Sequence, residues 1–259
     1  MRVLMIGCGN MGASLLTRWV ELPGTSFSVV DPATNFSDPR VKIFRSADTV
    51  EGDAFDLLVI AVKPQMIADA MPAYLKLVRV DAPALSIAAG VSCARLESVV
   101  GPRPIIRVMP NLPAKIGKGV SGVYFNANTS DAEKDKTREM MRAAGAVVEV
   151  DDEDGLDRVT AVAGSGPGYV FEIARAYVEA AKKLGFGDEQ ARTLVLGTLA
   201  GAVEMAAGST DDLADMRNAV TSKAGTTEAG LNALNGDGHL SKLMEAATQA
   251  AYERAVELR

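Results

Sequence analysis

A glycine-rich segment near the start of the chain has the spacing of a phosphate-binding turn. It runs Gly7-Cys8-Gly9-Asn10-Met11-Gly12, directly after an apolar run that predicts a strand. Gly7 would allow a tight turn, Gly9 would let the backbone approach a pyrophosphate, and Gly12 would let the next helix pack on the strand. Free N–H groups and the positive end of the helix dipole would bind the phosphates. The segment therefore predicts dinucleotide binding by Gly7, Gly9, Asn10, Met11 and Gly12.

One acidic side chain follows this turn at the distance expected of a ribose ligand. Asp31 ends the second predicted strand, roughly 20 residues after the glycines, where a carboxylate accepts hydrogen bonds from the adenosine ribose hydroxyls. This position weakly favours NADH over NADPH, because the carboxylate would repel a 2′-phosphate. Arg40 and Lys42 could offset that repulsion. The alternative is that Asp31 only forms a turn before Pro32.

A second segment, Val220–Glu228, is rich in hydroxyl groups and leads into a short predicted helix, Glu228–Leu234. Hydroxyl groups, free N–H groups at a helix start and the charge of Lys223 could together bind an anion. The alternative is a helix N-cap with spare hydroxyl groups. The hydroxyl side chains of the segment are Thr221, Ser222, Thr226 and Thr227.

Three further segments follow predicted strands. They would line one crevice, because ligands of open α/β sheets bind beyond the carboxyl ends of the strands. A fourth segment, Gly164–Pro167, opens a helix and would allow close backbone contact. The three segments are Ala61-Val62-Lys63-Pro64, Ala88-Ala89-Gly90 and Met109-Pro110-Asn111.

The elements that would position these residues alternate between strands and helices over residues 1–152. Several strands are almost continuously apolar, as parallel strands covered on both faces are. Helical spacing recurs in Met11–Trp19 and in Ile67–Leu75, where Pro72 weakens the helix. This alternation predicts an α/β fold with a doubly wound sheet. The expected strands are Val3–Ile6, Phe27–Val30, Val41–Phe44, Leu57–Val62, Leu85–Ala88, Ile105–Met109, Val120–Phe125 and Val147–Val150.

The acidic run Asp151–Asp154 is interpreted as a solvated boundary before a second domain, residues 153–259. The pattern beyond it is helical and rich in Ala and Gly, with Gly197 and Gly201 one turn apart where another helix could approach. So thin a core is marginal alone, which suggests packing against a second subunit. The expected helices run from Pro167 to a Gly185 cap, from an Asp188 cap to Gly208, over Thr210–Asn218 and Glu228–Leu234, and from Leu240 to Ala255.

The scarce residue types exclude several classes of site. One His and two Cys in 259 residues cannot make a thiolate or imidazole zinc site, and only His239 could serve a Ser-His-Asp or Cys-His mechanism. A net charge of −6 argues against nucleic acid as a partner. Cys8 and Cys93 form no disulfide framework, which favours a reducing, cytoplasmic setting. The apolar stretch Leu194–Gly208 contains Glu204 and is too short to span a membrane.

Taken together, these segments resemble the Δ1-pyrroline-5-carboxylate reductase family, in order and over essentially the whole chain. The resemblance implies a Rossmann domain over residues 1–152 and an all-α dimerisation and substrate domain over residues 153–259, interlocked with a second subunit. It also implies that dimers can assemble further into rings. The segments that carry it are Gly7–Gly12, Ala61–Pro64, Arg107-Val108-Met109-Pro110-Asn111, Ala163-Gly164-Ser165-Gly166-Pro167 and Thr221–Thr227, and the last three are the most specific.

The activity that the resemblance implies is reduction of the C=N bond of Δ1-pyrroline-5-carboxylate to L-proline by hydride transfer from NAD(P)H, the last step of proline biosynthesis. Thr227 is the candidate to orient the ring nitrogen or relay its proton. By the same resemblance, Ala61, Val62, Lys63 and Pro64 would line the nicotinamide side, and Ser222, Gly225, Thr226 and Thr227 would bind the substrate carboxylate and ring nitrogen.

The chain departs from the commonest loop of the family, Thr-Ser-Pro-Gly-Gly-Thr-Thr, at Lys223 and Ala224. If position 224 needs a positive φ, alanine would strain the loop. Because Gly225 and Thr227 remain, we expect this variation to be tolerated. Thr226 stands where some relatives have Ala, which makes Thr227 the stronger candidate.

An imine that enters already protonated needs no strong acid, because hydride transfer neutralises its charge. A site without an imidazole suits this substrate better than a carbonyl, whose reduction creates an alkoxide. Three alternatives stay open: an imine reductase for another small carboxylate, a β-hydroxyacid dehydrogenase and a non-catalytic NAD(P)-sensing protein. The second would have a Lys four residues after its G-x-G turn, where this chain has Val170. A sensor would have no use for a second anion site.

Overall fold

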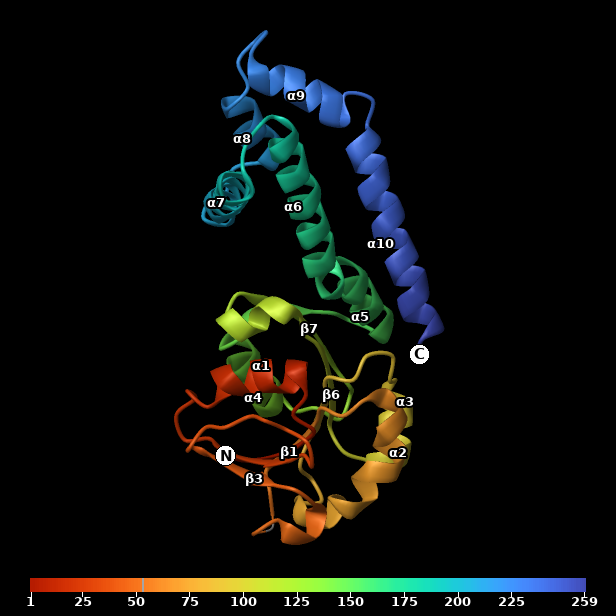
Figure 1. Cartoon of the computed structure of the whole chain (residues 1–259). Coiled ribbons are helices and arrows are strands. Elements are labelled where there is room, and N and C mark those ends of the chain that lie inside the picture. The colour runs from red at the N-terminus through yellow and green to blue at the C-terminus, as the bar shows by residue number, and fades with distance from the viewer. Residues whose placement is uncertain (53) are drawn as a thin grey trace. The chain divides into compact units, whose positions relative to one another are not determined.

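A mixed sheet of eight strands forms one part of the computed structural model, which describes residues 1–52 and 54–259 (Figure 1). The strand order is β3-β2-β1-β4-β5-β6-β7-β8, and neighbours are parallel except for the antiparallel pair β6 and β7. The predicted doubly wound α/β fold is therefore confirmed. The strands are β1 (Arg2–Ile6), β2 (Ser26–Val30), β3 (Val41–Phe44), β4 (Leu57–Ile60), β5 (Ala84–Ser86), β6 (Ile105–Met109), β7 (Gly119–Phe125) and β8 (Gly145–Glu149).

Helices cover both faces of this sheet, which explains why its central strands are apolar on both sides. One core joins the sheet to α1 and α4, where the buried Trp19 indole donates a hydrogen bond to the carbonyl of Met140 at 2.9 Å. The other core joins the opposite face to α2 and α3. These helices are α1 (Asn10–Trp19), α2 (Ile67–Ala70), α3 (Cys93–Val100) and α4 (Asp131–Arg142).

The expected helix over Ile67–Leu75 is wrong in its length, because only its first four residues are α-helical. Pro72 has no N–H group to donate and its ring clashes with the carbonyl four residues earlier, so the helix cannot continue through it. Short 3₁₀ turns flank α2 at Pro64–Met66, Met71–Ala73 and Leu75–Leu77.

The chain divides into two compact units: a sheet unit, residues 1–167 and 250–259, and a helical unit, residues 168–249. The helical pattern expected beyond the acidic run is present. A short π-helical turn, Thr160–Gly164, follows α5. The helices are α5 (Glu153–Val159), α6 (Gly166–Lys183), α7 (Asp188–Ala207), α8 (Leu213–Ala219), α9 (Thr226–Asn235) and α10 (His239–Glu257).

The helix ends only partly follow the predicted caps. Gly185 has φ +101° after the end of α6, as expected of a C-terminal glycine. Asp188 is the first residue of α7, so its prediction as the cap is wrong, and Gly187 takes the cap position. Asp212 caps α8, and its carboxylate accepts a hydrogen bond from the N–H of Ala214 at 2.7 Å.

The helical unit buries few large side chains of its own. Its core cluster contains only Ala181, Ala191 and Val195, with two partly buried neighbours. A Cβ placed at Gly197 or Gly201 would meet no atom within 4 Å, so this face of α7 is open. No helix of the described residues is long and apolar enough to cross a membrane. The exposed apolar side chains of α6 and α7 include Val170, Phe171, Ile173, Tyr177, Leu194, Val203 and Met205.

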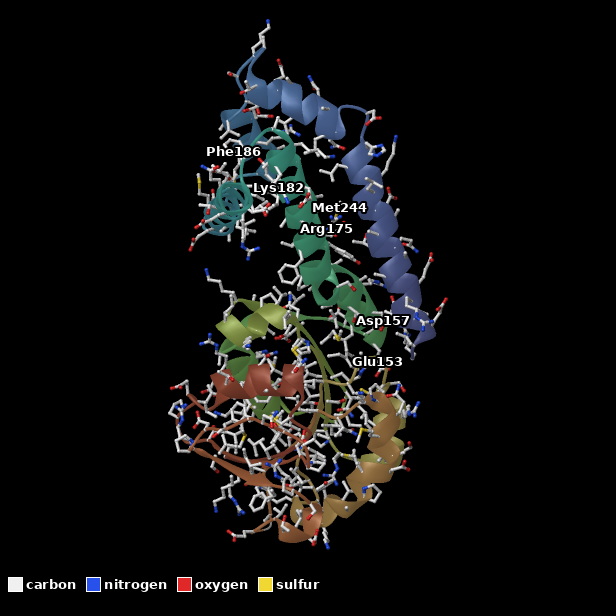
Figure 2. The ribbon with its side chains drawn as sticks, viewed as in Figure 1. Glu153, Asp157, Arg175, Lys182, Phe186 and Met244 are labelled. Atoms are coloured by element: carbon white, nitrogen blue, oxygen red, sulfur yellow. The ribbon has the colours of Figure 1, made fainter. Side chains whose placement is uncertain are left out.

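Asp151 and Asp152 of the acidic run are exposed, as a solvated run predicts, but Glu153 (labelled in Figure 2) and its neighbours in the run also hold α5 in place. Asp152 caps α5 with its side chain. Glu153 accepts a hydrogen bond from the N–H of Cys93 at 2.5 Å, and its carboxylate lies 3.3 Å from Nη1 of the buried Arg107. Glu153 thus connects the start of α5 to α3 and to β6.

Two more carboxylates tie α5 to the end of α10, within the sheet unit. The Tyr252 hydroxyl donates to Asp154 at 2.8 Å, and Arg259 forms an ion pair with the same carboxylate at 2.8 Å. Arg259 Nε also donates to Asp157 at 2.5 Å, and Asp157 is only 3% exposed. A buried carboxylate of this kind is stable only with such a partner.

We predict that Glu153→Ala destabilises the protein, because it leaves the buried guanidinium of Arg107 without its counter-charge. Breaking a buried pair from one side costs about 3 kcal/mol. Urea unfolding at one fixed protein concentration measures the free energy of unfolding. Asp135→Ala, which removes an exposed carboxylate from Arg138, is the control and should change little. Equal effects of the two variants would contradict the anchoring role of Glu153.

The same pair should make stability depend on pH. Burial would raise the pKa of Glu153, but hydrogen bonds from Cys93 and the charge of Arg107 outweigh it and lower that pKa below the ordinary 4.5. A lowered folded-state pKa adds stability above the unfolded value and loses it as the pH falls. The difference between wild type and Glu153→Ala should therefore shrink as the pH is lowered below about 4.5.

Candidate active site

The glycine turn after β1 has a backbone that only glycine can adopt at its first position. Gly7 has φ +86°, and a Cβ placed there would lie 2.7 Å from the carbonyl oxygen of Ala61. A Cβ at Gly12 would lie 2.6 Å from the terminal methyl of Met5. Tight turn and close helix packing, the roles predicted for Gly7 and Gly12, therefore both have a steric cause.

The start of α1 presents unpaired N–H groups, as an anion site requires. Gly9 occupies the N-cap position and provides no side-chain cap. Gly9 and Asn10 are exposed, and a Cβ at Gly9 would meet nothing within 4 Å. The first N–H groups of a helix have no intrahelical acceptor. Asn10 and Met11, in the first turn, therefore fit the pyrophosphate of a dinucleotide.

The segment after β4 lies against this turn, because β4 is the neighbour of β1 in the sheet. The N–H of Ala61 donates to the carbonyl of Ile6 at 2.8 Å. Val62 is close enough that its Cγ1 would lie 2.9 Å from a Cβ on Gly7. Lys63 is exposed, and Pro64 opens a short 3₁₀ turn. The structure thus brings Ala61 and Val62, two of the four predicted residues of this segment, directly against the glycine turn.

Asp31, on the other side of the turn, has hydrogen bonds to the backbone. One carboxylate oxygen accepts from the N–H of Cys8 at 2.7 Å, and the other accepts from the N–H of Ala33 at 2.8 Å. The bond to Ala33 is the turn contact that was the alternative interpretation. The Thr34 hydroxyl also donates to the carbonyl of Cys8, at 3.1 Å. Asp31 therefore fixes the glycine turn to the end of β2.

Arg45, which follows β3, is not among the residues that the sequence predicts for this site. Its Nη1 donates to the carbonyls of Asp31 at 3.1 Å and Thr34 at 3.2 Å, so a guanidinium lies on the loop after β2. Arg40, by contrast, pairs with Asp38 and Glu21. The signal available in the sequence was a cation just after the third strand, whose carboxyl end adjoins that of the second.

The two cysteines are free thiols without features of a reactive site. Cys8 is 4% exposed, and burial raises the pKa of its thiol. Burial, with the nearby Glu153, raises the pKa of Cys93 to about 12. Reactive cysteines have lowered pKa values, so both residues serve packing and backbone hydrogen bonding.

Two other predicted crevice residues serve the frame of the sheet unit. Asn111 is 7% exposed; its side chain accepts from the N–H of Val120 at 2.8 Å and donates to the carbonyl of Ala163 at 3.0 Å. Gly90 has φ +70°, and a Cβ there would lie 2.4 Å from the carbonyl oxygen of Leu258. Both residues hold neighbouring segments together.

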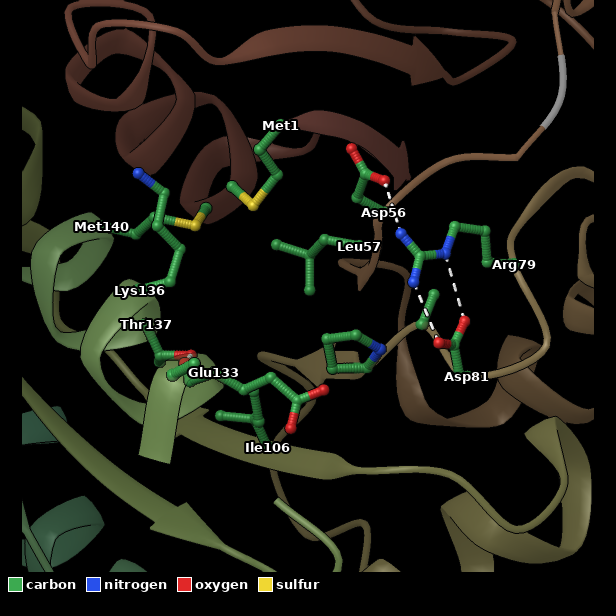
Figure 3. A pocket seen from close by; sticks show the side chains of 13 residues that line it. Met1, Asp56, Leu57, Arg79, Asp81, Ile106, Glu133, Lys136, Thr137 and Met140 are labelled. Carbon is green, nitrogen blue, oxygen red and sulfur yellow. Dashed lines mark hydrogen bonds and ion pairs between the residues drawn. The ribbon is translucent and has the colours of Figure 1, made fainter. Parts of the chain in front are cut away.

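The cavity shown in Figure 3 is not part of this site, because it lies at the opposite, amino-terminal edge of the parallel strands. It encloses about 250 Å³. Its charged groups have partners within the protein: Arg79 pairs with Asp56 at 3.3 Å and with Asp81 at 2.9 Å. Leu57 and Ile106 contribute apolar surface.

In the helical unit, the hydroxyl-rich segment forms a turn at the start of α9. Gly225 is the N-cap, so α9 begins at Thr226, two residues before the predicted start. Thr226 and Thr227 therefore lie in the first helical turn, where N–H groups are free. The N–H of Gly225 donates to the carbonyl of Ser222 at 3.0 Å. A Cβ on Gly225 would lie 2.3 Å from the Ser222 hydroxyl, which explains the glycine.

The structure brings the four predicted substrate-binding residues together in this one turn. The side chains of Ser222, Thr226 and Thr227 are exposed, and Lys223 beside them is exposed too. Ala224 has φ +56°, which is the left-handed conformation considered for this position. A turn of hydroxyl groups and free N–H groups at a positive helix end can bind a carboxylate.

Comparisons with known proteins show the family of the chain. A family model described as pyrroline-5-carboxylate reductase dimerisation matches residues 153–258. The chain is 39% identical to the pyrroline-5-carboxylate reductase of Pseudomonas aeruginosa, covering 99% of this chain and 96% of that one. It is 33% identical to the enzyme of the same name from Vibrio alginolyticus, covering 99% of this chain and 97% of that one.

A solved structure gives the same result for the fold. The pyrroline-5-carboxylate reductase of Coxiella burnetii superposes with a TM-score of 0.89 at 30% sequence identity, covering 99% of this chain and 97% of that one. Because relatives of such identity extend over almost the entire sequence, the chain belongs to the pyrroline-5-carboxylate reductase family.

Proposed function

We propose that the protein reduces the C=N bond of Δ1-pyrroline-5-carboxylate to L-proline with a hydride from NAD(P)H, the last step of proline biosynthesis. One observation carries the proposal. A chain of this family has a glycine turn at Gly7–Gly12 and a hydroxyl-rich turn at Ser222–Thr227, each opening a helix. Both present free N–H groups where an anionic part of a reactant would bind.

The glycine turn is assigned to the dinucleotide. Gly7, Gly9 and Gly12 shape it, and the N–H groups of Asn10 and Met11 would donate to the pyrophosphate. Ala61-Val62-Lys63-Pro64 follows the neighbouring strand and is assigned to the nicotinamide side. The bound cofactor supplies the hydride.

The hydroxyl-rich turn is assigned to the imino acid. Ser222, Gly225 and Thr226 would hold the carboxylate, and the Thr227 hydroxyl would orient the ring nitrogen or relay its proton. An imine that binds as an iminium needs a hydrogen-bonding group rather than a strong acid. The one histidine, His239, begins α10, and its backbone N–H donates to the carboxylate of Asp237 at 3.0 Å. The proposal gives it no part in the reaction.

Thr227→Ala should lower kcat/KM for Δ1-pyrroline-5-carboxylate by about 10- to 100-fold, the effect of losing a hydrogen bond to a charged group. The affinity for NAD(P)H, measured by fluorescence titration, should not change, because the residue lies outside the dinucleotide turn. Thr226→Ala is the matched comparison, and its kcat/KM should fall by a smaller factor. A collapse of cofactor affinity in Thr227→Ala would show that the assignment is wrong.

One assay separates this proposal from its alternatives. Protein, NADH or NADPH, and Δ1-pyrroline-5-carboxylate are mixed and the absorbance at about 340 nm, which reduced nicotinamide gives, is followed. Loss of absorbance supports the proposal. No turnover with either cofactor would favour a different imine or carboxylate substrate, or an NAD(P)-sensing protein.

We also propose that residues 153–259 form a dimerisation and substrate domain, and that the protein is a homodimer that can assemble further into a ring. The dimerisation family model and the exposed apolar side chains of α6 and α7 support the dimer. The free thiols of Cys8 and Cys93 fit the reducing cytoplasm, where we place the activity.

Gly201→Leu tests the dimer, because the open space around Gly201 would tolerate the side chain in one subunit but not beneath a partner helix. We expect light scattering to show dissociation to single chains. Glu139→Leu places the same side chain on an exposed position of α4 and should leave the mass unchanged. A dissociated wild-type protein would refute the dimer itself.

The cofactor preference depends in this proposal on two opposed charges. Asp31 weakly favours NADH, because its carboxylate would repel a 2′-phosphate. Arg45 lies on the same loop and would attract one. Arg45→Ala should therefore raise KM for NADPH about tenfold while KM for NADH changes little. Arg40→Ala is the control, because Arg40 is paired with Asp38 and Glu21. Equal changes for both cofactors would exclude a role for Arg45 in selectivity.

A further inference from the structure

Ala224 has a backbone conformation that is costly for alanine. Among the described residues, only Ala54 and Ala224 have a positive φ without being glycine. The left-handed conformation costs a residue with a Cβ roughly 1–2 kcal/mol. Ala224 lies between Ser222 and Gly225 in the turn assigned to the substrate, so some contact must keep the turn in this shape.

Glu228 makes that contact. Its Oε2 accepts a hydrogen bond from the N–H of Ala224 at 2.6 Å. Glu228 is the third residue of α9, and in an ordinary capping box such a residue binds the N–H of the N-cap. Here the N–H of the N-cap, Gly225, donates to the carbonyl of Ser222 instead. The carboxylate therefore reaches one residue further back, to the strained alanine.

This contact bears directly on the groups that would bind the substrate. Thr226 and Thr227 come between Ala224 and Glu228 in the sequence, so the hydrogen bond closes the backbone around them. The Ser222 hydroxyl lies against Gly225 within the same turn. If the turn relaxed at Ala224, Ser222 would shift relative to the two threonines.

We infer that Glu228 is a positioning residue, which holds Ala224 in its left-handed conformation and so keeps Ser222, Thr226 and Thr227 ready for the substrate carboxylate. The inference rests on the proposed function for the identity of the ligand. It adds a residue that never touches the substrate and acts only through the backbone of the turn. If the turn were relaxed, part of the free energy of substrate binding would be used to order it, and the substrate would bind more weakly.

Four variants test this role: Glu228→Ala, Glu228→Gln, Ala224→Gly, and the double variant Glu228→Ala with Ala224→Gly. Glu228→Ala should raise KM for Δ1-pyrroline-5-carboxylate about tenfold. The kcat and the affinity for NADPH should change little, because the turn would be disordered only while no substrate is bound. Glu228→Gln keeps an acceptor oxygen but loses the charge, so its KM should lie between those of wild type and Glu228→Ala. The double variant should recover most of the KM, because glycine adopts the conformation without a brace.

A second measurement does not depend on activity. Hydrogen exchange of the Val220–Thr227 peptide should be faster in Glu228→Ala than in wild type, and Glu245→Ala, an exposed carboxylate of α10, should leave it unchanged. Unchanged exchange and KM in Glu228→Ala would overturn the inference. A Gln variant as impaired as the Ala variant, or a double variant without rescue, would also overturn it. If the wild-type protein does not turn over the substrate, the proposed function fails, and the exchange result still decides whether Glu228 braces the turn.

Discussion

The close approach of Gly7 to Ala61 is the constraint on which the proposed dinucleotide site depends. The chain leaves β1 with a positive φ, at a point where the neighbouring strand leaves no space for a side chain. On the other side, the Asp31 carboxylate holds the N–H of Cys8. The turn is thus fixed between both neighbours of the central strand, and the free N–H groups of α1 are in position before any ligand binds. Such preorganisation lowers the entropic cost of binding.

The helical unit has a thin core of its own, and the segments on either side of it in the sequence are fixed by contacts within the sheet unit. In sequence it is bounded on both sides by segments anchored in the sheet unit: α5 through Glu153 and Arg107, and the end of α10 through Arg259 and Asp157. Fixing both ends reduces the chain entropy that folding must overcome. These contacts do not bury the apolar surface of the helical unit. In the proposed dimer, a second subunit packed on the open face around Gly201 would bury it.

The sheet could be predicted because period and composition are local properties, and all eight strands lie where apolar runs indicate. The sequence indicated that Pro72 would weaken the helix expected at Ile67–Leu75, but it did not indicate that the α-helix would end at Ala70. Contacts between distant residues were not predictable. Nothing around Asp31 indicates that its carboxylate binds the N–H of Cys8, and nothing near Glu153 indicates that Arg107 is its partner. The interpretation of the acidic run did not include the contacts of Glu153 and Asp154, because the sequence shows charges but not their partners.

The turn at α9 shows how a side chain can replace the conformational freedom of glycine. The commonest family loop has glycine where this chain has Ala224, and the left-handed backbone then costs roughly 1–2 kcal/mol. A hydrogen bond to a charged acceptor contributes about 1.5–3 kcal/mol, enough to offset that cost. A carboxylate near a helix start also reduces the positive field available to an anionic ligand. By pointing one oxygen at the N–H of Ala224, Glu228 stabilises the turn through the backbone, at the expense of part of this positive field.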